Sequence, residues 1–305
     1  MASLSVIVPV FNEATVLDEF HQRLQTVLSG MQELVCEILY VNDGSADDSL
    51  AVLRRLAATD QTVGFISLSR NLGKEAAMSA GLDRVDSDAV VIIDADLQDP
   101  PELIPEMVRR WREGYDTVYG QRSERHGESW IKRATAHAFY RLMQGVGRFS
   151  IPADTGDFRL LSRRCVEAPR QIPERNRFMK GLFAWIGYPQ VALRYSRDPR
   201  FAGDTKFNYW KLWNFALDGI TSFTTMPLKL ATYIGVLVAG AAFLYGVLIV
   251  VKTLLYGDPV AGFPTLITVI LFLGGIQLLF LGILGEYLGR MFDETKRRPL
   301  YLIEE

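Results

Sequence analysis

Short apolar runs alternate with longer helical patterns over the first ninety or so residues of the chain. The apolar runs are residues 4–10, 36–41, 63–68 and 90–93. The segments between them repeat apolar positions every three or four residues, at 14–30, 47–57 and 75–83. Strands that alternate with helices of this length are typical of βαβ units and a parallel sheet. A further helix at 101–114 and strand at 115–119 extend the pattern, so we predict an α/β fold.

The fourth apolar run ends abruptly in carboxylates, within VVIIDADLQDPP at residues 90–101. Residues two apart on a strand point to the same side, so Asp94 and Asp96 are expected to converge. Converging carboxylates repel each other unless a cation or a proton lies between them. Mg²⁺ or Mn²⁺, completed by substrate phosphates, fits such a site. A surface turn with capping aspartates explains this triplet equally well when it is taken alone.

Three of the predicted strands end in polar turns. These are FNE at 11–13, NDGS at 42–45 and DADLQD at 94–99. The carboxyl ends of parallel strands lie along one edge of the sheet, where ligands bind in open α/β folds. Each turn alone has ordinary turn chemistry, but three acidic turns on one edge favour a functional cleft.

The chain becomes strongly apolar after residue 229. Residues 207–226 form an amphipathic pattern rich in aromatic side chains, which is typical of a helix in the membrane interface. Two uncharged stretches follow, 230–251 and 262–285, and a membrane span needs about 20 apolar residues. Buried core helices are the alternative, but two such stretches back to back favour a transmembrane hairpin. Basic residues from Arg290 onward predict that the tail, and hence both termini, are cytoplasmic.

Composition narrows the functional classes. The net charge of −2 argues against nucleic acid as a partner. Cys36 and Cys165 lack metal-ligand spacing and are expected to be reduced core residues. The amino terminus has no basic segment or cleavage site of a signal peptide. Small residues in the hairpin, such as Gly235 and Gly275, would permit association into a homo-oligomer.

Four motifs follow one another along the chain: VIVPVFNE, VNDGS, RNLGKEAA and DADLQDPPE. With them the chain resembles the family 2 glycosyltransferases of GT-A fold. Within that family it resembles the polyprenyl-phosphate branch of bactoprenol glucosyltransferases and dolichyl-phosphate mannose synthases. The resemblance covers about residues 3–215, and the hairpin fits the bactoprenol enzymes. It implies a GT-A domain at 1–205, an interfacial helix at 206–228, two transmembrane helices within 229–289 and a cytoplasmic tail at 290–305.

The resemblance also implies roles for individual residues. Those expected to bind the nucleotide sugar are Pro9, Phe11, Glu13, Asp43, Arg70, Lys74 and Asp94. Those expected to contact the divalent metal are Asp96, Asp94 and Gln98. Those expected at the acceptor phosphate or the diphosphate are Arg122, Lys132, Arg133, Arg200 and Lys206. Solvated basic loops are the alternative for this last group.

A second acidic motif, DTGDFRL at residues 154–160, resembles a stretch of the bactoprenol branch. It makes Asp157 the first candidate for the catalytic carboxylate and Asp154 the second. A phosphate monoester has a second pKa near 6, so the acceptor is already largely a dianion at pH 7. It needs positioning more than proton removal, which leaves open whether Asp157 is a base or a positioning residue.

Together these features predict an inverting, metal-dependent transfer of glucose from UDP-glucose to undecaprenyl phosphate at the cytoplasmic membrane face. Glucose follows from the resemblance alone, and GDP-mannose or a UDP-aminopentose would give the same reaction. A non-catalytic membrane scaffold would be expected to have lost its metal ligands, yet Asp94, Asp96 and Gln98 are all present. A nucleotidyltransferase would be expected to have a glycine-rich loop after the first strand, which VPVFNE lacks.

Overall fold

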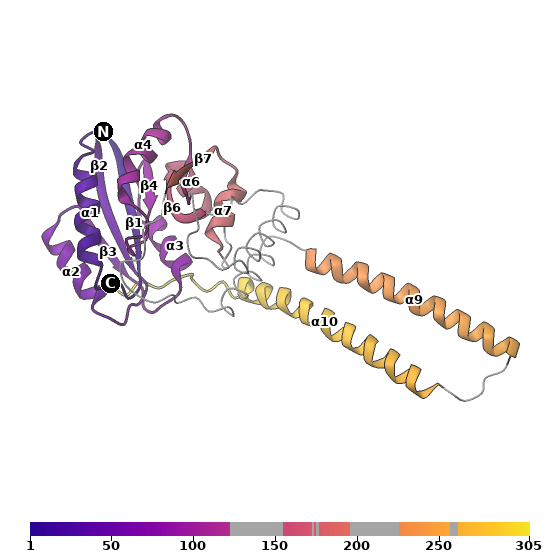
Figure 1. Cartoon of the computed structure of the whole chain (residues 1–305). Coiled ribbons are helices and arrows are strands. Elements are labelled where there is room, and N and C mark those ends of the chain that lie inside the picture. The colour runs from indigo at the N-terminus through magenta and orange to yellow at the C-terminus, as the bar shows by residue number, and fades with distance from the viewer. Residues whose placement is uncertain (123–154, 173, 175–176, 196–225, 257–261) are drawn as a thin grey trace. The chain divides into compact units, whose positions relative to one another are not determined.

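The computed structural model describes residues 1–122, 155–172, 174, 177–195, 226–256 and 262–305. The chain divides into two compact units, which Figure 1 shows. The sheet unit consists of Met1–Ala216 together with Arg298–Glu305, and the hairpin unit consists of Leu217–Arg297.

A seven-stranded sheet forms the centre of the sheet unit, in the order β3-β2-β1-β4-β6-β5-β7. Its first four strands in the chain are β1 (Ala2–Val10), β2 (Leu34–Asn42), β3 (Val63–Ser67) and β4 (Ala89–Ile92). These four are mutually parallel, as the alternating pattern predicts. Their carboxyl ends therefore lie on one edge of the sheet.

The other half of the sheet is mixed. Its strands are β5 (Thr117–Arg122), β6 (Thr155–Ser162) and β7 (Gln190–Tyr195). β6 lies between β4 and β5 and is antiparallel to both. Ile92 of β4 pairs with Arg159 of β6, and continuing that register by two residues would place Asp157 opposite Asp94. The sheet is therefore mostly parallel, with an antiparallel strand beside β4.

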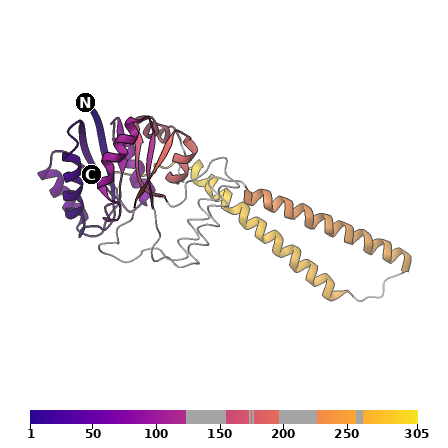
Figure 2. The same ribbon diagram turned by 45° about the horizontal axis from the view of Figure 1, so that its top comes forward.

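Helices cover both faces of the sheet, as the two views show (Figures 1 and 2). They are α1 (Leu17–Ser29), α2 (Ser49–Thr59), α3 (Lys74–Arg84), α4 (Ile104–Arg112), α6 (Arg163–Arg170) and α7 (Met179–Ile186). The short 3₁₀ helix η1 (Pro101–Leu103) begins the predicted helix at 101–114.

Alternate residues of β1 face opposite layers. Val6 and Val8 belong to one buried cluster with apolar residues of α1, α2 and α4. Ile7 faces α3 on the other side, where a Cβ added at Gly81 would lie 2.6 Å from the Ile7 side chain. The absence of a side chain at Gly81 thus lets α3 pack closely on β1 and β2.

Residues beyond the hairpin return to the sheet unit. Leu68, just past β3, forms an antiparallel bridge with Ile303. The main-chain N–H of Ser67 donates to Glu305 at 2.7 Å, and that of Ser69 donates to Leu302 at 2.9 Å. The tail therefore pairs with the chain beside the edge strand of the sheet, directly before the Arg70–Lys74 turn.

The hairpin unit contains two long helices, α9 (Met226–Tyr256) and α10 (Phe263–Thr295). Both are long and apolar enough to cross a membrane, through Pro227–Leu248 and Phe272–Thr295. Large apolar side chains along them are exposed, such as Leu237 and Leu278. Residues 206–225 of the predicted interfacial helix lie outside the described residues, and the predicted domain boundaries stay a prediction.

Candidate active site at the sheet edge

The turns after β1 and β2 are joined by hydrogen bonds. The N–H of Asn12 donates to the Ser45 hydroxyl at 3.0 Å, and the N–H of Glu13 donates to the Ser49 hydroxyl at 3.0 Å. The main-chain N–H of Asp43 donates to Val10 at 2.9 Å. Two of the three acidic turns that the sequence placed on one edge are thus in direct contact.

Asp43 holds the Arg70–Lys74 turn against this edge. Its two carboxylate oxygens accept hydrogen bonds from the N–H groups of Leu72 and Gly73, at 2.8 and 3.0 Å. Burial raises the pKa of Asp43, although these two hydrogen bonds oppose the shift. The predicted contact of Asp43 with a nucleotide stays a prediction, because the structure shows its carboxylate anchoring the neighbouring turn.

Glycine is required beside Asp43. Gly44 has a φ of +60°, and a Cβ built on it would lie 2.3 Å from the carbonyl carbon of Arg70. The close approach and the left-handed backbone both exclude a side chain there. Asp43 and Gly44 thus place a carboxylate and a side-chain-free backbone directly against the Arg70–Lys74 turn.

Lys74 links Asp94 with Asp157. The ammonium group donates to the Asp94 carboxylate at 2.7 Å and to Oδ2 of Asp157. Burial opposes the charge on Lys74, but the two carboxylates outweigh it and raise the pKa of Lys74 above its usual range. The sequence analysis predicted a divalent metal at Asp94 and Asp96, which stays a prediction; the ammonium group of Lys74 is the cation that the structure places at Asp94.

A second lysine approaches the other oxygen of Asp157. Nζ of Lys180 lies 3.6 Å from Oδ1, and the Asp157 side chain is only 15% exposed. Burial alone would raise the pKa of Asp157, but Lys74 and Lys180 outweigh burial and hold that pKa well below its usual range. Asp157 is therefore held as an anion with little tendency to take up a proton.

Two further ionisable residues surround this group. Arg159 is buried, lies over the ring of Phe183 at 4.8 Å, and donates to the carbonyl of Gly156 at 3.0 Å. Glu75 accepts a hydrogen bond from the N–H of Met179 at 3.2 Å. Burial and the charge of Asp157 raise the pKa of Glu75 to about 7.

The residues expected to bind metal lie in an anchored turn after β4. Oδ1 of Asp96 accepts a hydrogen bond from the N–H of Gln98 at 3.2 Å, and Leu97 between them has a φ of +59°. Buried Asp99 accepts a hydrogen bond from the Tyr195 hydroxyl at the end of β7. Asp96 and Gln98 are each partly buried.

The described residues contain no group of three or more His, Cys, Asp or Glu side chains placed to hold a metal. Mg²⁺ is commonly held by one or two carboxylates together with substrate phosphates. The oxygen donors of Asp96 and Asp94 fit a metal of that kind, with Asp94 also engaged by Lys74.

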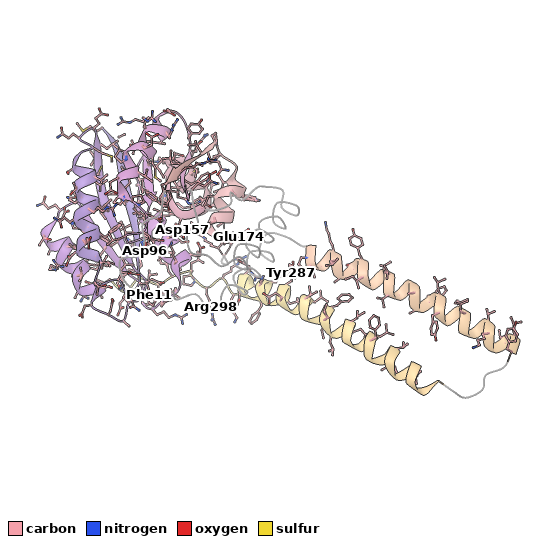
Figure 3. The ribbon with its side chains drawn as sticks, in the orientation of Figure 1. Phe11, Asp96, Asp157, Glu174, Tyr287 and Arg298 are labelled. Carbon is pink, nitrogen blue, oxygen red and sulfur yellow. The ribbon has the colours of Figure 1, made fainter. Side chains whose placement is uncertain are left out.

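The other predicted residues divide into two groups. Pro9 lies in β1, and Phe11 and Glu13 lie in the turn after it, with Phe11 36% exposed. Figure 3 labels Phe11, Asp96 and Asp157 in the sheet unit. Arg70 is exposed in its turn, and Arg122 ends β5. The predicted residues that lie outside the described residues are Asp154, Lys132, Arg133, Arg200 and Lys206.

Sequence reasoning missed Glu75, Arg159 and Lys180. Each is a charged residue within a mainly apolar or small-residue segment, such as FMKGLFAWI around Lys180. A charge in such a segment is a weak signal by itself, because most are solvated at the surface. Arg159 lies on the same strand as Asp157, whereas Glu75 and Lys180 lie on α3 and α7.

Comparisons with known proteins match both units of the chain. Residues 5–168 match the family model of glycosyl transferase family 2, and residues 226–291 match the model of the GtrB C-terminal hairpin. An uncharacterized glycosyltransferase of Synechocystis sp. is 50% identical, over 99% of this chain and 95% of its own. A bactoprenol glucosyl transferase of Shigella phage SfV is 46% identical, over 99% and 98% of the two chains.

Among solved structures, a mannosyl-3-phosphoglycerate synthase from Rubrobacter xylanophilus is similar in fold. It is 20% identical, with a TM-score of 0.49, and the match covers 71% of each chain.

Proposed function

The chain belongs to glycosyl transferase family 2, and from this premise we propose that it transfers a sugar from a nucleoside diphosphate to a polyprenyl phosphate. Its predicted architecture, a GT-A α/β sheet with a C-terminal hairpin of two apolar helices, is confirmed. The donor that we propose is UDP-glucose, and the acceptor is undecaprenyl phosphate.

The observation that carries this proposal is that one chain contains both a charged site at the sheet edge and a hairpin of two long apolar helices. The sheet unit brings Lys74, Asp94 and Asp157 together beside the ends of parallel strands. The hairpin unit has two helices of membrane-spanning length. The likeness to bactoprenol glucosyl transferases extends over both parts, as expected of an enzyme whose acceptor cannot leave the membrane.

In the proposed reaction, a phosphate oxygen of the acceptor attacks the anomeric carbon of the sugar. The bond from that carbon to the donor diphosphate breaks on the opposite face, and the nucleoside diphosphate leaves with the bond's electrons. A divalent metal bound at Asp96 and Asp94 would supply positive charge to the leaving diphosphate. Lys74, which already pairs with two carboxylates, adds a fixed ammonium group beside it.

The environment of Asp157 favours positioning over proton removal. Its pKa is held well below the usual range, so it is a weak base. The acceptor phosphate is largely a dianion at pH 7 and has no proton to lose on most molecules. We therefore assign Asp157 to the orientation of lysine side chains.

We propose that the hairpin spans the cytoplasmic membrane and that both termini are cytoplasmic. The basic residues after the second span support this orientation, because cytoplasmic segments next to spans are enriched in lysine and arginine. This orientation places the active site where nucleotide sugars are made.

A donor screen tests the reaction. Purified protein in detergent is mixed with undecaprenyl phosphate and radiolabelled UDP-glucose, UDP-galactose, GDP-mannose or a UDP-aminopentose, with and without EDTA. We expect labelled lipid from UDP-glucose alone, lost in EDTA and reduced at least about 100-fold in Asp96→Ala. Asp86→Ala, which removes an exposed carboxylate paired with Arg163, is the matched control and should stay active.

Labelled lipid from a different donor would show that the transferred sugar is not glucose, and the proposed mechanism would stand. Transfer that persists in EDTA would contradict the metal assignment. No labelled lipid from any donor, with folded protein and an acceptor that a known enzyme can use, would favour a non-catalytic scaffold.

A further inference from the structure

Lys180 is the residue of this site whose role the family motifs do not explain. It is the second residue of α7, and its side chain is 24% exposed. Residues around it in the same helix are buried, including Met179, Leu182 and Phe183. The helix is therefore packed into the sheet unit, and Lys180 is the position from which it presents a cation to Asp157.

The start of α7 is fixed to the helix that carries Lys74. Glu75, the neighbour of Lys74 on α3, accepts the hydrogen bond from the N–H of Met179, the neighbour of Lys180 on α7. Lys74 and Lys180 then reach opposite oxygens of Asp157. Two ammonium groups from two helices are thus directed at one carboxylate by a contact between the helices themselves.

The contact of Lys180 with Asp157 leaves hydrogen-bond donors of the Lys180 ammonium group available. The N–O distance of 3.6 Å exceeds the 2.7–2.9 Å or so of a strong charge-assisted hydrogen bond. An ammonium group has three donors, and among the described residues Asp157 is the ion-pair partner recorded for Lys180. Lys74 makes the closer contact with the same carboxylate.

We propose that Lys180 binds a phosphate group of a substrate together with Lys74, and that Asp157 orients the two ammonium groups for it. This inference rests on the proposed function, because that reaction brings phosphate groups to the candidate site. Phosphate oxygens are strong acceptors for lysine, and both lysines are partly exposed. The phosphate can belong to the diphosphate of the donor or to the lipid acceptor, and the experiment distinguishes these sources.

The experiment compares Lys180→Gln and Lys180→Arg with the wild-type full chain in detergent. Initial rates give KM for each substrate and kcat, and calorimetry gives the affinities for UDP and for uridine, which lacks phosphates. We expect Lys180→Gln to weaken the binding of one phosphate-bearing substrate by about tenfold and to leave uridine binding unchanged. Lys180→Arg, which keeps the charge, should recover most of the loss.

The pattern of change identifies the source of the phosphate. Weaker UDP binding with an unchanged KM for the acceptor assigns Lys180 to the donor diphosphate. Unchanged UDP binding with a raised KM for polyprenyl phosphate assigns it to the acceptor. Arg163→Gln removes an exposed cation of α6 and is the matched control, for which we expect wild-type values.

Two results would overturn the inference. Lys180→Gln could match the wild type in UDP affinity and in both KM values, or it could lose only thermal stability and kcat. Either result would make Lys180 a structural partner of Asp157. A wild-type protein inactive with every donor contradicts the proposed function instead, while the comparison of UDP with uridine still tests Lys180.

Discussion

At the scale of single residues, Glu75 lies where a charge is costly. Burial and the charge of Asp157 on β6 together raise its pKa to about 7. Lys74 on its own helix and Lys180 on α7 oppose it. A carboxyl group whose pKa rises on folding stabilises the fold below its unfolded pKa and loses that contribution as pH rises through the folded value.

We therefore expect wild-type stability to decline between pH 5 and pH 8 relative to Glu75→Gln, which keeps an acceptor for Met179 but has no charge. The decline should be on the order of 1–3 kcal/mol, and thermal unfolding in detergent measures it. Glu102→Gln is the control, because the Arg23 hydrogen bond outweighs burial and lowers the pKa of Glu102. Parallel curves for wild type and Glu75→Gln would contradict the raised pKa.

At the scale of elements, the candidate site depends on how the turns at the sheet edge contact one another. The Asp43-Gly44 pair after β2 holds the Arg70–Lys74 turn by two hydrogen bonds and by a close backbone approach. Lys74 begins α3 directly after that turn. A shift of the turn would therefore move the ammonium group that links Asp94 with Asp157.

Gly44→Ala should displace this turn, since its new Cβ would overlap the backbone of Arg70. We expect a loss of stability on the order of 1–3 kcal/mol from the strained backbone and a fall of about tenfold in UDP affinity, measured by calorimetry. In the control Gly64→Ala, the added Cβ makes an ordinary contact 3.7 Å from Leu39. Unchanged UDP affinity in a folded Gly44→Ala protein would show that the Arg70–Lys74 turn does not contribute to donor binding.

The parallel half of the sheet follows from local patterns, and the neighbourhood of Asp157 does not. The apolar runs and turns up to residue 93 locate β1 to β4 and their shared edge. Asp157 reaches that edge because Arg159 pairs with Ile92, in a register between strands 67 positions apart. No local periodicity encodes such a pairing. For the same reason the sequence could not show that Asp94 pairs with Lys74, or that Lys180 approaches Asp157.

At the scale of the whole molecule, the tail after α10 belongs to the sheet unit. It pairs beside β3, the edge strand, through main-chain hydrogen bonds of Ser67 and Ser69. Tyr301 donates to Asp83 of α3 at 2.8 Å, and Arg54 of α2 forms an exposed ion pair with Glu305. The tail thus occupies the carboxyl end of this edge, at Ser67, where another chain could otherwise pair.

Deletion of residues 299–305 should destabilise the sheet unit by about 2–4 kcal/mol, because several backbone hydrogen bonds are lost together. Thermal unfolding in detergent measures this loss, and light scattering should report more aggregation. Arg54→Gln, the control, removes only the exposed ion pair and should change stability by less than about 1 kcal/mol. A deletion variant that melts with the wild type would show that the tail pairing adds no stability.

The position of the tail in the chain has a consequence for biosynthesis. Residues 302–305 follow both long helices, so they leave the ribosome after the hairpin has been made. Ser67 and Ser69, made more than two hundred residues earlier, have no access to these partners until then. A nascent sheet unit folds from its amino terminus, yet its edge stays open while the hairpin is being synthesised. Completion of the sheet unit is thereby timed to follow synthesis of the two long apolar helices.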